Sequence, residues 1–215
     1  MLTVHSGPPS AGGDLPRSVV KILSGAIQAI ANRGVKRLSM SDIIDASNVS
    51  RGTLYRYFSN KDEVLAAVAE YVCTEFERGI ADAGDGIADP TERMRAVLRF
   101  YARYTLKSSA SRIFEVEPAF HLAFFRDRFP RYEIAVLNAL EPFFAHLDAI
   151  GATWMDRAGT VDMIIRTHLS SILVPIDQDW IRRWEEMIDK IADLVRSPPS
   201  PAILSIERAP PLRGR

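Results

Sequence analysis

Cysteine is nearly absent from this 215-residue sequence, which contains only Cys73. A single cysteine cannot form a disulfide within the chain or a cysteine-based zinc site, so both are excluded. We expect Cys73 to be a small buried side chain on a helix rather than a reactive thiol. The four histidines show no metal-ligand spacing, and the sequence predicts neither a bound metal nor a cofactor.

Long apolar runs are absent too, because no segment approaches the roughly 18 apolar residues that a membrane-spanning helix requires. Residues 1–14 are rich in Gly, Pro and Ser and lack the basic cluster and apolar stretch of a signal peptide. The sequence therefore predicts a cytoplasmic protein with no membrane partner. Apolar residues still make up 47% of the chain, which is enough for a substantial core.

An excess of one charge is also missing, since 27 basic residues balance 27 acidic ones. This balance argues against a protein that coats nucleic acid. The distribution is uneven, however, because residues 1–65 hold eight Lys or Arg and five Asp or Glu, a net charge of +3, and the remainder carries −3. The positive end is the one suited to a polyanion.

Recognisable catalytic motifs are missing as well. The sequence has no Gly-X-Ser-X-Gly, no His-Glu-X-X-His, no phosphate-binding loop and no dinucleotide-binding glycine pattern. We therefore expect no catalytic residues and no enzymatic activity. An enzyme with an apolar helical pocket stays as the minor alternative.

What the sequence does contain is helical periodicity along nearly its whole length, with no convincing strand pattern. The expected fold class is therefore all-α. The predicted helices start near Pro16, Ser41, Arg51, Lys61, Pro90, Pro130, Asp156 and Asp179. Pro142 is expected to kink or end the helix that starts at Pro130. A stripe formed by Arg95, Arg99 and Arg103 is interpreted as a solvated surface.

The most specific signal lies in residues 39–61, which read SMSDIIDASNVSRGTLYRYFSNK. Two short helices separated by a tight turn are the helix-turn-helix arrangement. Asn48 tolerates the left-handed backbone conformation that such a turn needs, and Ser50 is suited to cap the next helix. That helix is too short to be stable alone, so we expect Leu54 and Phe58 to hold it against the first helix.

The outer face of this short helix would then present hydrogen-bond donors to a partner. Side chains of these types reach the phosphates and base edges of DNA. They are Arg51, Thr53, Tyr55, Arg56 and Tyr57.

This stretch resembles the signature of the TetR family of transcriptional regulators. The matching residues are Ser39, Asp42-Ile43, Val49-Ser50, Arg51-Gly52-Thr53-Leu54-Tyr55-Arg56-Tyr57-Phe58 and Lys61. The detailed match covers residues 16–65, and it departs from the usual family pattern at Asn48, where glycine is common. The resemblance implies an N-terminal three-helix DNA-binding domain with a helix-turn-helix, followed by a C-terminal helical domain for ligand binding and dimerisation.

The resemblance also implies phosphate contacts on both sides of the turn. Ser39 and Ser41 would touch phosphate at the start of the second helix, with Ser41 near a base. Ser50 would leave free N–H groups that favour phosphate at the start of the third helix. Tyr55 and Lys61 would clamp phosphates on either side, although Lys61 could also be only a surface charge.

The bases themselves would be read from the third helix. Arg51, Thr53 and Arg56 are implied to face the major groove, and Gly52 would allow close backbone approach. Tyr57 would either lie at the DNA edge or pack beneath it.

The family's second domain holds a ligand pocket, and this sequence has many apolar and aromatic residues between 63 and 148. Singly, each is more typical of a core than of a pocket, but their density around the expected helix breaks at 108–111 and 128–130 favours a cavity. The apolar candidates are Phe76, Met94, Leu98, Tyr101, Tyr104, Phe114, Phe120, Phe124 and Phe125. The candidate polar handles are Glu117, His121, Arg166 and His168.

The last two expected helices, at about 156–173 and 179–196, are implied to form the dimer interface. Two such pairs would make a four-helix bundle, and the alternative is packing within one chain. The apolar face consists of Trp180, Ile181, Trp184, Ile188 and Ile191.

The resulting hypothesis is a ligand-responsive DNA-binding transcription regulator. It would bind double-stranded DNA at an inverted-repeat operator as a homodimer, and a small apolar or amphipathic effector would release it, as expected of a repressor. The alternatives are a regulator controlled without a small ligand and a helix-turn-helix used for protein contact. The predicted divisions are a flexible arm, a DNA-binding domain, a ligand-binding and dimerisation domain, and a Pro-rich tail, at residues 1–14, 15–62, 63–197 and 198–215.

Overall fold

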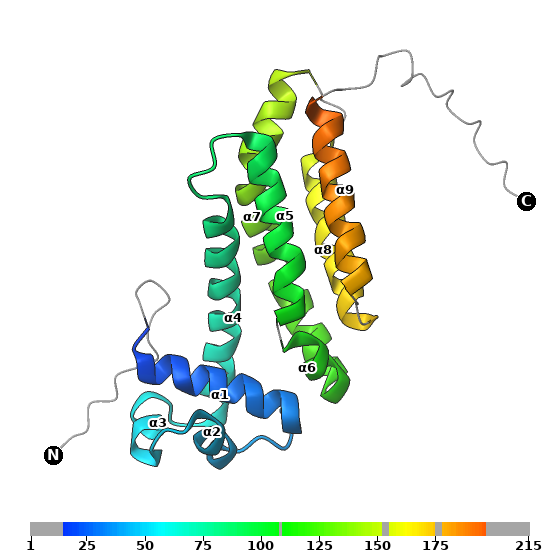
Figure 1. Cartoon of the computed structure of the whole chain (residues 1–215). Coiled ribbons are helices and arrows are strands. Elements are labelled where there is room, and N and C mark those ends of the chain that lie inside the picture. Colours follow the sequence, from blue (N-terminus) through cyan, green and yellow to red (C-terminus); the bar gives the residue numbers. More distant parts are fainter. Residues whose placement is uncertain (1–14, 108, 152–154, 175–177, 197–215) are drawn as a thin grey trace, which may run out of the picture.

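The computed structural model describes four stretches of the chain: 15–107, 109–151, 155–174 and 178–196. All the regular secondary structure in these stretches is helical, which confirms the all-α prediction (Figure 1). The helices are α1 (Arg17–Arg33), α2 (Met40–Ser47), α3 (Arg51–Tyr57), α4 (Lys61–Gly84), α5 (Pro90–Lys107), α6 (Ala110–Val116), α7 (Pro118–Ala149), α8 (Arg157–Leu173) and α9 (Gln178–Arg196).

Helices α1 to α3 form a small unit at one end of the molecule, which we call the head (Figure 1). Its apolar core includes Leu54 and Phe58, both fully buried, so the predicted anchoring of α3 is confirmed. Gly25 explains how closely α1 and α2 approach, since a Cβ there would lie 2.5 Å from the backbone nitrogen of Ser47. The head is therefore held by its own core and by a close helix crossing.

Helices α4 to α9 form an elongated bundle, which we call the body (Figure 1). Helix α4 connects the two units, because Val64 and Val68 near its start belong to the core of the head, whereas Phe76 and Ile80 belong to the core of the body. A movement of α4 against the body is therefore also a movement of the head.

Helix α7 corrects the predicted break at residues 128–130. The helix runs without interruption from Pro118 to Ala149, and Pro130 and Pro142 both lie inside it. A proline in a helix removes one backbone hydrogen bond and crowds the preceding turn. Here the buried side of α7, which includes Val136 and Phe144, packs along the body core on both sides of the prolines. That packing outweighs the local cost, so neither proline ends the helix.

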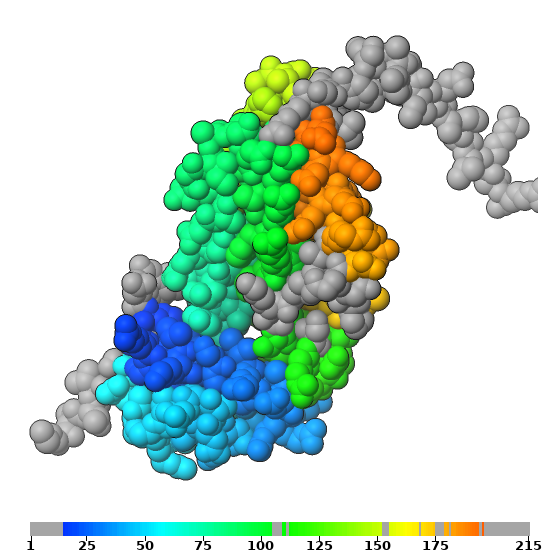
Figure 2. Space-filling model, in the orientation of Figure 1, coloured from blue at the N-terminus to red at the C-terminus, as the bar shows by residue number. Residues whose placement is uncertain are grey.

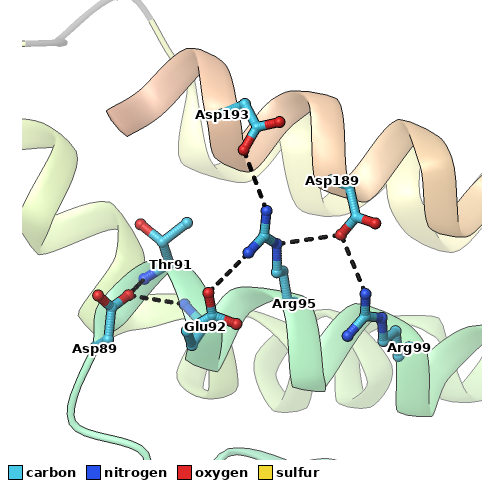
Figure 3. Close-up of polar contacts among 7 residues, drawn as sticks. All are labelled: Asp89, Thr91, Glu92, Arg95, Arg99, Asp189 and Asp193. Carbon is cyan, nitrogen blue, oxygen red and sulfur yellow. Dashed lines mark hydrogen bonds and ion pairs between the residues drawn. The ribbon is translucent and has the colours of Figure 1, made fainter. Parts of the chain in front are cut away.

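The arginine stripe on α5 faces α9 (Figure 3), so the predicted solvated surface is confirmed only in part: Arg95 is 13% exposed, whereas Arg99 and Arg103 are 39% and 61% exposed. Arg95 and Arg99 both reach Asp189, at 3.2 Å and 3.1 Å. Arg103 pairs with Glu185 at 2.9 Å. Ion pairs at four-residue spacing on both helices fix the register of α9 along α5, in addition to the apolar contacts between them.

The start of α9 also differs slightly from the prediction. Asp179 lies in the first turn of the helix, which begins at Gln178, and not at the cap position. By contrast, Asp156 does cap α8 by accepting a hydrogen bond from the backbone nitrogen of Gly159, as predicted. In the described stretches, no helix is long and apolar enough to cross a bilayer.

Candidate nucleic-acid interface and cavities

The start of α2 is fixed by a reciprocal pair of hydrogen bonds. The side chain of Ser39 accepts from the backbone nitrogen of Asp42 at 3.2 Å, and the carboxylate of Asp42 accepts from the backbone nitrogen of Ser39 at 2.9 Å. The Ser39 hydroxyl donates to the same carboxylate at 2.7 Å. These hydrogen bonds, together with Arg33 at 2.6 Å, lower the pKa of Asp42. Ser39 is thus a helix cap in the free protein, whereas Ser41 beside it is exposed.

The turn between α2 and α3 has the conformation expected from the sequence. Asn48 adopts a left-handed backbone with φ 52°. Ser50 then caps α3, since its hydroxyl oxygen accepts from the backbone nitrogen of Thr53 at 3.1 Å. The hydroxyls of Ser50 and Thr53 also lie 2.8 Å apart. The α3 end of the turn is therefore fixed by the Ser50 cap, and the α2 end by the left-handed backbone of Asn48.

The outward face of α3 is exposed at the end of the molecule opposite the body (Figure 2). Arg51, Gly52 and Arg56 are exposed, and Tyr55 is 37% exposed. Among the described residues, a Cβ added at Gly52 would meet only the Ser50 hydroxyl, at 3.9 Å, so none of their atoms requires glycine there. The guanidinium of Arg51 lies 6.0 Å from the ring centroid of Tyr55. The guanidinium groups of Arg51 and Arg56, the phenol of Tyr55 and the bare backbone of Gly52 thus share one face of α3.

Two candidate residues are held by the protein itself. The hydroxyl of Tyr57 accepts from Ser18 on α1 at 3.1 Å and from Arg56 at 3.2 Å. The hydrogen bond from Ser18 is the main reason that the pKa of Tyr57 is lowered. Lys61 donates to the backbone oxygen of Val35 at 3.3 Å. Tyr57 therefore packs beneath the exposed face, and the ammonium group of Lys61 is held by the loop before α2.

The first of two cavities lies where the head meets the body, and we call it the inner cavity. Its volume is about 280 Å³, and its wall combines residues from α1, α4, α5, α6 and α7. Five candidate ligand residues line it: Tyr104, Phe120, His121, Phe124 and Phe125. Residues that the sequence did not single out also line it, among them Ile27, Ile30, Val72 and Ile113. Only the docking of α1 on the body brings Ile27 and Ile30 to the cavity.

The second cavity, which we call the outer cavity, lies between α6, α7 and α8. Its volume is about 510 Å³. Phe114 and Arg166 from the candidate set line it, together with His121 and Phe125, which it shares with the inner cavity. Arg126 also lines it, although nothing in the sequence pattern distinguished this arginine from the others.

Several candidate ligand residues lie away from both cavities. Phe76, Met94, Leu98 and Tyr101 are buried in the body core and line neither cavity. Phe76 is surrounded by rings, with centroids 5.6 Å from Tyr101 and 4.9 Å from Tyr132 in edge-on arrangements. Close aromatic packing explains why these apolar side chains fill the core instead of lining a hollow. The side chain of His168 is outside the described part of the structure.

Glu117 and His121, two of the candidate polar handles, have different surroundings. A carboxylate oxygen of Glu117 accepts from the backbone nitrogen of Lys36 at 3.4 Å, so Glu117 connects the body to the head. His121 is only 6% exposed, and burial lowers its pKa to about 4. Its Nε2 atom has no hydrogen-bond partner among the described residues. The imidazole is therefore neutral at physiological pH, with one ring nitrogen unsatisfied.

The residues proposed for a dimer interface divide between the core and the surface. Ile188 is completely buried in the body core, and Trp184 and Ile191 pack partly against that core. Trp180 stacks on Trp184 with ring centroids 5.5 Å apart, and the side chain of Ile181 is outside the described part. An open groove between α8 and α9 is lined by Trp184, Met163 and Met187, and Met163 is 63% exposed. Most of the apolar face of α9 thus packs within its own chain. In the groove, Met163 and Met187 are exposed.

Comparison with known proteins places the strongest similarity in the head. Residues 22–68 match the family model described as bacterial regulatory proteins, tetR family. An uncharacterised HTH-type transcriptional regulator of Bacillus subtilis, YvdT, is 41% identical over 54 residues, which is 25% of this chain and 28% of that protein. The chain thus matches less than a third of the length of that relative.

Solved structures match over most of the chain. The fatty acid degradation regulator FadR from Bacillus halodurans has a TM-score of 0.60 at 18% identity, covering 85% of this chain and 96% of that one. AibR in complex with isovaleryl coenzyme A and operator DNA has a TM-score of 0.57 at 22% identity, covering 81% and 97%. At these identities the similarity shows a common fold of head and body.

Proposed function

We propose that this chain, whose residues 22–68 match the model of the TetR family of bacterial regulatory proteins, is a transcription regulator that binds operator DNA through α2 and α3. The observation that carries the proposal is the exposed face of α3, where Arg51, Tyr55 and Arg56 surround Gly52. These side chains are exposed toward base edges and phosphates, because Leu54 and Phe58 on the opposite side hold the helix.

The proposed contacts follow from how each side chain is held. Arg51, Thr53 and Arg56 read bases in the major groove, and Tyr55 contacts phosphate from the same face. Ser41 and the N–H groups beside Ser50 contact phosphate on the other side of the turn. Ser39 and Tyr57 act mainly by holding α2 and α3 in place, since both are engaged in hydrogen bonds within the head. We propose that the boundary between the DNA-binding and regulatory domains lies in the first turn of α4, near residue 62.

The proposed regulator acts as a homodimer, because one seven-residue helix contacts few bases. Two heads reading half-sites about 34–36 Å apart would recognise an inverted repeat. The groove between α8 and α9, with its exposed Met163 and Met187, is the apolar surface that we assign to this contact. Ile188 is excluded from the interface because it is buried in its own chain.

The effector is proposed to be a small apolar or amphipathic molecule that binds in the body and favours one placement of the heads. AibR has been solved with isovaleryl coenzyme A and operator DNA together, which supports a ligand of this kind for a protein of the same fold. A ligand shifts the population only as far as it binds one state better than the other. We propose that binding releases the operator, so that the protein is a repressor and has no enzymatic role.

The test is DNA binding by the purified protein to the inverted repeat upstream of its own gene, measured by fluorescence anisotropy. Arg51→Ala should weaken operator binding by about 1–3 kcal/mol, roughly five- to 150-fold, and reduce discrimination against a scrambled site. Arg78→Ala, on the exposed side of α4, is the matched loss of one arginine and should leave affinity unchanged. Equal operator affinity for Arg51→Ala and the parent would refute the assignment of α3.

A further inference from the structure

The inner and outer cavities lie back to back. Each is lined by His121 and Phe125, so these two side chains of α7 form a wall between them. The ring of Phe125 stacks on Tyr132 with centroids 5.6 Å apart, and the ring of His121 packs 4.8 Å from Phe125. The two side chains that both cavities share are therefore aromatic rings in contact with each other.

The wall contains the unsatisfied ring nitrogen of His121. Buried polar atoms almost always have a hydrogen-bond partner, but Nε2 of His121 has none among the described residues and the ring is only 6% exposed. Displacement of the His121 ring therefore breaks no hydrogen bond at Nε2 within the described residues.

The far end of the inner cavity reaches the head. Ile27 and Ile30 of α1 line it, and Ile30 is also part of the head core. Across the cavity, Ala69 and Val72 belong to α4, the helix that joins head and body. An occupant at this end touches the DNA-binding unit directly and would push α1 and α4 apart.

The edge of the outer cavity is cationic, whereas the end of the inner cavity beside α1 is apolar. Arg126 and Arg166 line it, and both side chains are exposed, at 80% and 62%. Each has a carboxylate neighbour, Asp127 and Asp162, but exposed ion pairs of this kind are weak. A ligand anion can therefore compete for the two guanidinium groups.

We propose that the two cavities form one site for a linear amphipathic anion. Its charged end lies beside Arg126 and Arg166, and its apolar chain displaces the wall of His121 and Phe125 to reach Ile27 and Ile30. Chain length then separates two outcomes: a short chain fills only the outer cavity and binds without effect on the head, whereas a long chain enters the inner cavity and lowers DNA affinity. The second outcome rests on the proposed DNA-binding function.

The first experiment uses straight-chain carboxylates as probes. Calorimetry with hexanoate, decanoate and hexadecanoate should detect binding of all three, with affinity rising with chain length as more apolar surface is buried. At saturation, hexadecanoate should reduce operator affinity by about tenfold or more, a typical coupling between two sites, and hexanoate should not reduce it. Decanol, which has the chain of decanoate without its charge, should bind more weakly because it leaves Arg126 and Arg166 unpaired.

The second experiment blocks the inner cavity from α4. Ala69→Phe and Val72→Phe each place a ring in that cavity, from positions that are half-buried in the native protein. Both variants should bind hexanoate as the parent does and bind hexadecanoate at least about tenfold more weakly. Hexadecanoate bound to either variant should no longer release the operator, since the coupling between the ligand site and the DNA site is lost. Ala66→Phe is the matched control, because Ala66 is exposed on α4 and lines neither cavity.

Three results would overturn the proposal: no binding of any carboxylate, release of the operator by hexanoate as complete as by hexadecanoate, or identical chain-length profiles for the parent and both blocked variants. A protein that does not bind DNA at all would instead refute the proposed function. In that case, calorimetry with the blocked variants would still decide whether the two cavities are one site.

Discussion

The head and the body of this protein are stabilised in different ways. In the head, side chains close in sequence fix the ends of the short helices: Ser39 with Asp42, and Ser50 with Thr53. In the body, long helices pack along one another over large apolar surfaces, and residues far apart in sequence meet, such as Phe76 and Tyr132. The head is therefore specified locally, whereas the body is specified by its packing.

This difference separates the two proposed tasks. Reading DNA requires a surface that keeps its shape, and the caps and the close contact at Gly25 provide one. Responding to a ligand requires space for the ligand and side chains that can repack around it, and the two cavities beside α7 provide that space. Where the units meet, Glu117 accepts from Lys36 and Arg112 donates to the backbone oxygen of Ala31, so movement of α6 reaches the end of α1.

The largest expected effect comes from removing one buried ring from each unit. Phe58→Ala in the head and Phe144→Ala in the body should each reduce the free energy of unfolding by about 3–5 kcal/mol. Phe58→Ala should also abolish operator binding while most of the helical signal persists. Urea denaturation followed by circular dichroism, together with operator binding, measures both effects. If the two variants lost helical signal and DNA binding in parallel, the head and the body would form one cooperative unit.

A smaller effect is expected where α1 crosses α2. Gly25→Ala places a methyl group 2.5 Å from the backbone nitrogen of Ser47, so one helix must shift. Overpacking of this kind costs about 1–3 kcal/mol, and the shift should weaken operator binding as well. Gly52→Ala is the control for stability, since a Cβ there meets only one atom, at 3.9 Å. A Gly25→Ala variant as stable as Gly52→Ala would contradict the account of the crossing.

The cap of α2 is expected to contribute less. Ser39→Ala should cost about 1 kcal/mol, the usual value for loss of a capping side chain. Because the pKa of Asp42 is lower in the folded state than in the unfolded chain, its stabilising contribution is complete above its ordinary pKa and is lost as the pH falls through the folded value. Acid titration of stability should therefore show a smaller loss for Ser39→Ala than for the parent. An equal loss would show that the cap does not cause the pKa shift.

The smallest effect is expected at the ion pairs between α5 and α9. Asp189→Asn removes the carboxylate shared by Arg95 and Arg99 (Figure 3). Partly exposed ion pairs contribute about 0–1 kcal/mol and are screened by salt, so the loss in unfolding free energy should be visible at low salt and disappear at high salt. Glu186→Gln, which breaks only an exposed pair within α9, should have little effect at either salt concentration. A loss that persists at high salt would mean that Asp189 acts through packing.

Much of the head could be predicted from the sequence. The turn at Asn48, the cap at Ser50 and the burial of Leu54 and Phe58 all follow from residue type and spacing, and the structure confirms them. The prediction was less complete for Tyr57, because its partner Ser18 lies 39 residues away on another helix. The proposed DNA contacts themselves stay predictions until the binding experiments are made.

The body was predicted in outline only. Helical periodicity located most of its helices, but the prolines suggested a break where α7 is continuous. Aromatic density suggested a cavity without distinguishing its lining from the core, so Phe76 and Tyr101 were grouped with Phe120 and Phe124. Likewise, the arginine stripe on α5 gave no sign of its acidic partners on α9, some 90 residues further on.

The sequence by itself determined the all-α class, the position of the helix-turn-helix and the residues exposed on α3. It could do so because helical period, capping and left-handed turns are decided by neighbours within a few residues. Only the tertiary structure decided that α1 closes the inner cavity, that α7 bridges its prolines and that α9 packs on α5. These features depend on apolar contacts and ion pairs between distant segments, whose free energies exist only once the chain has brought them together.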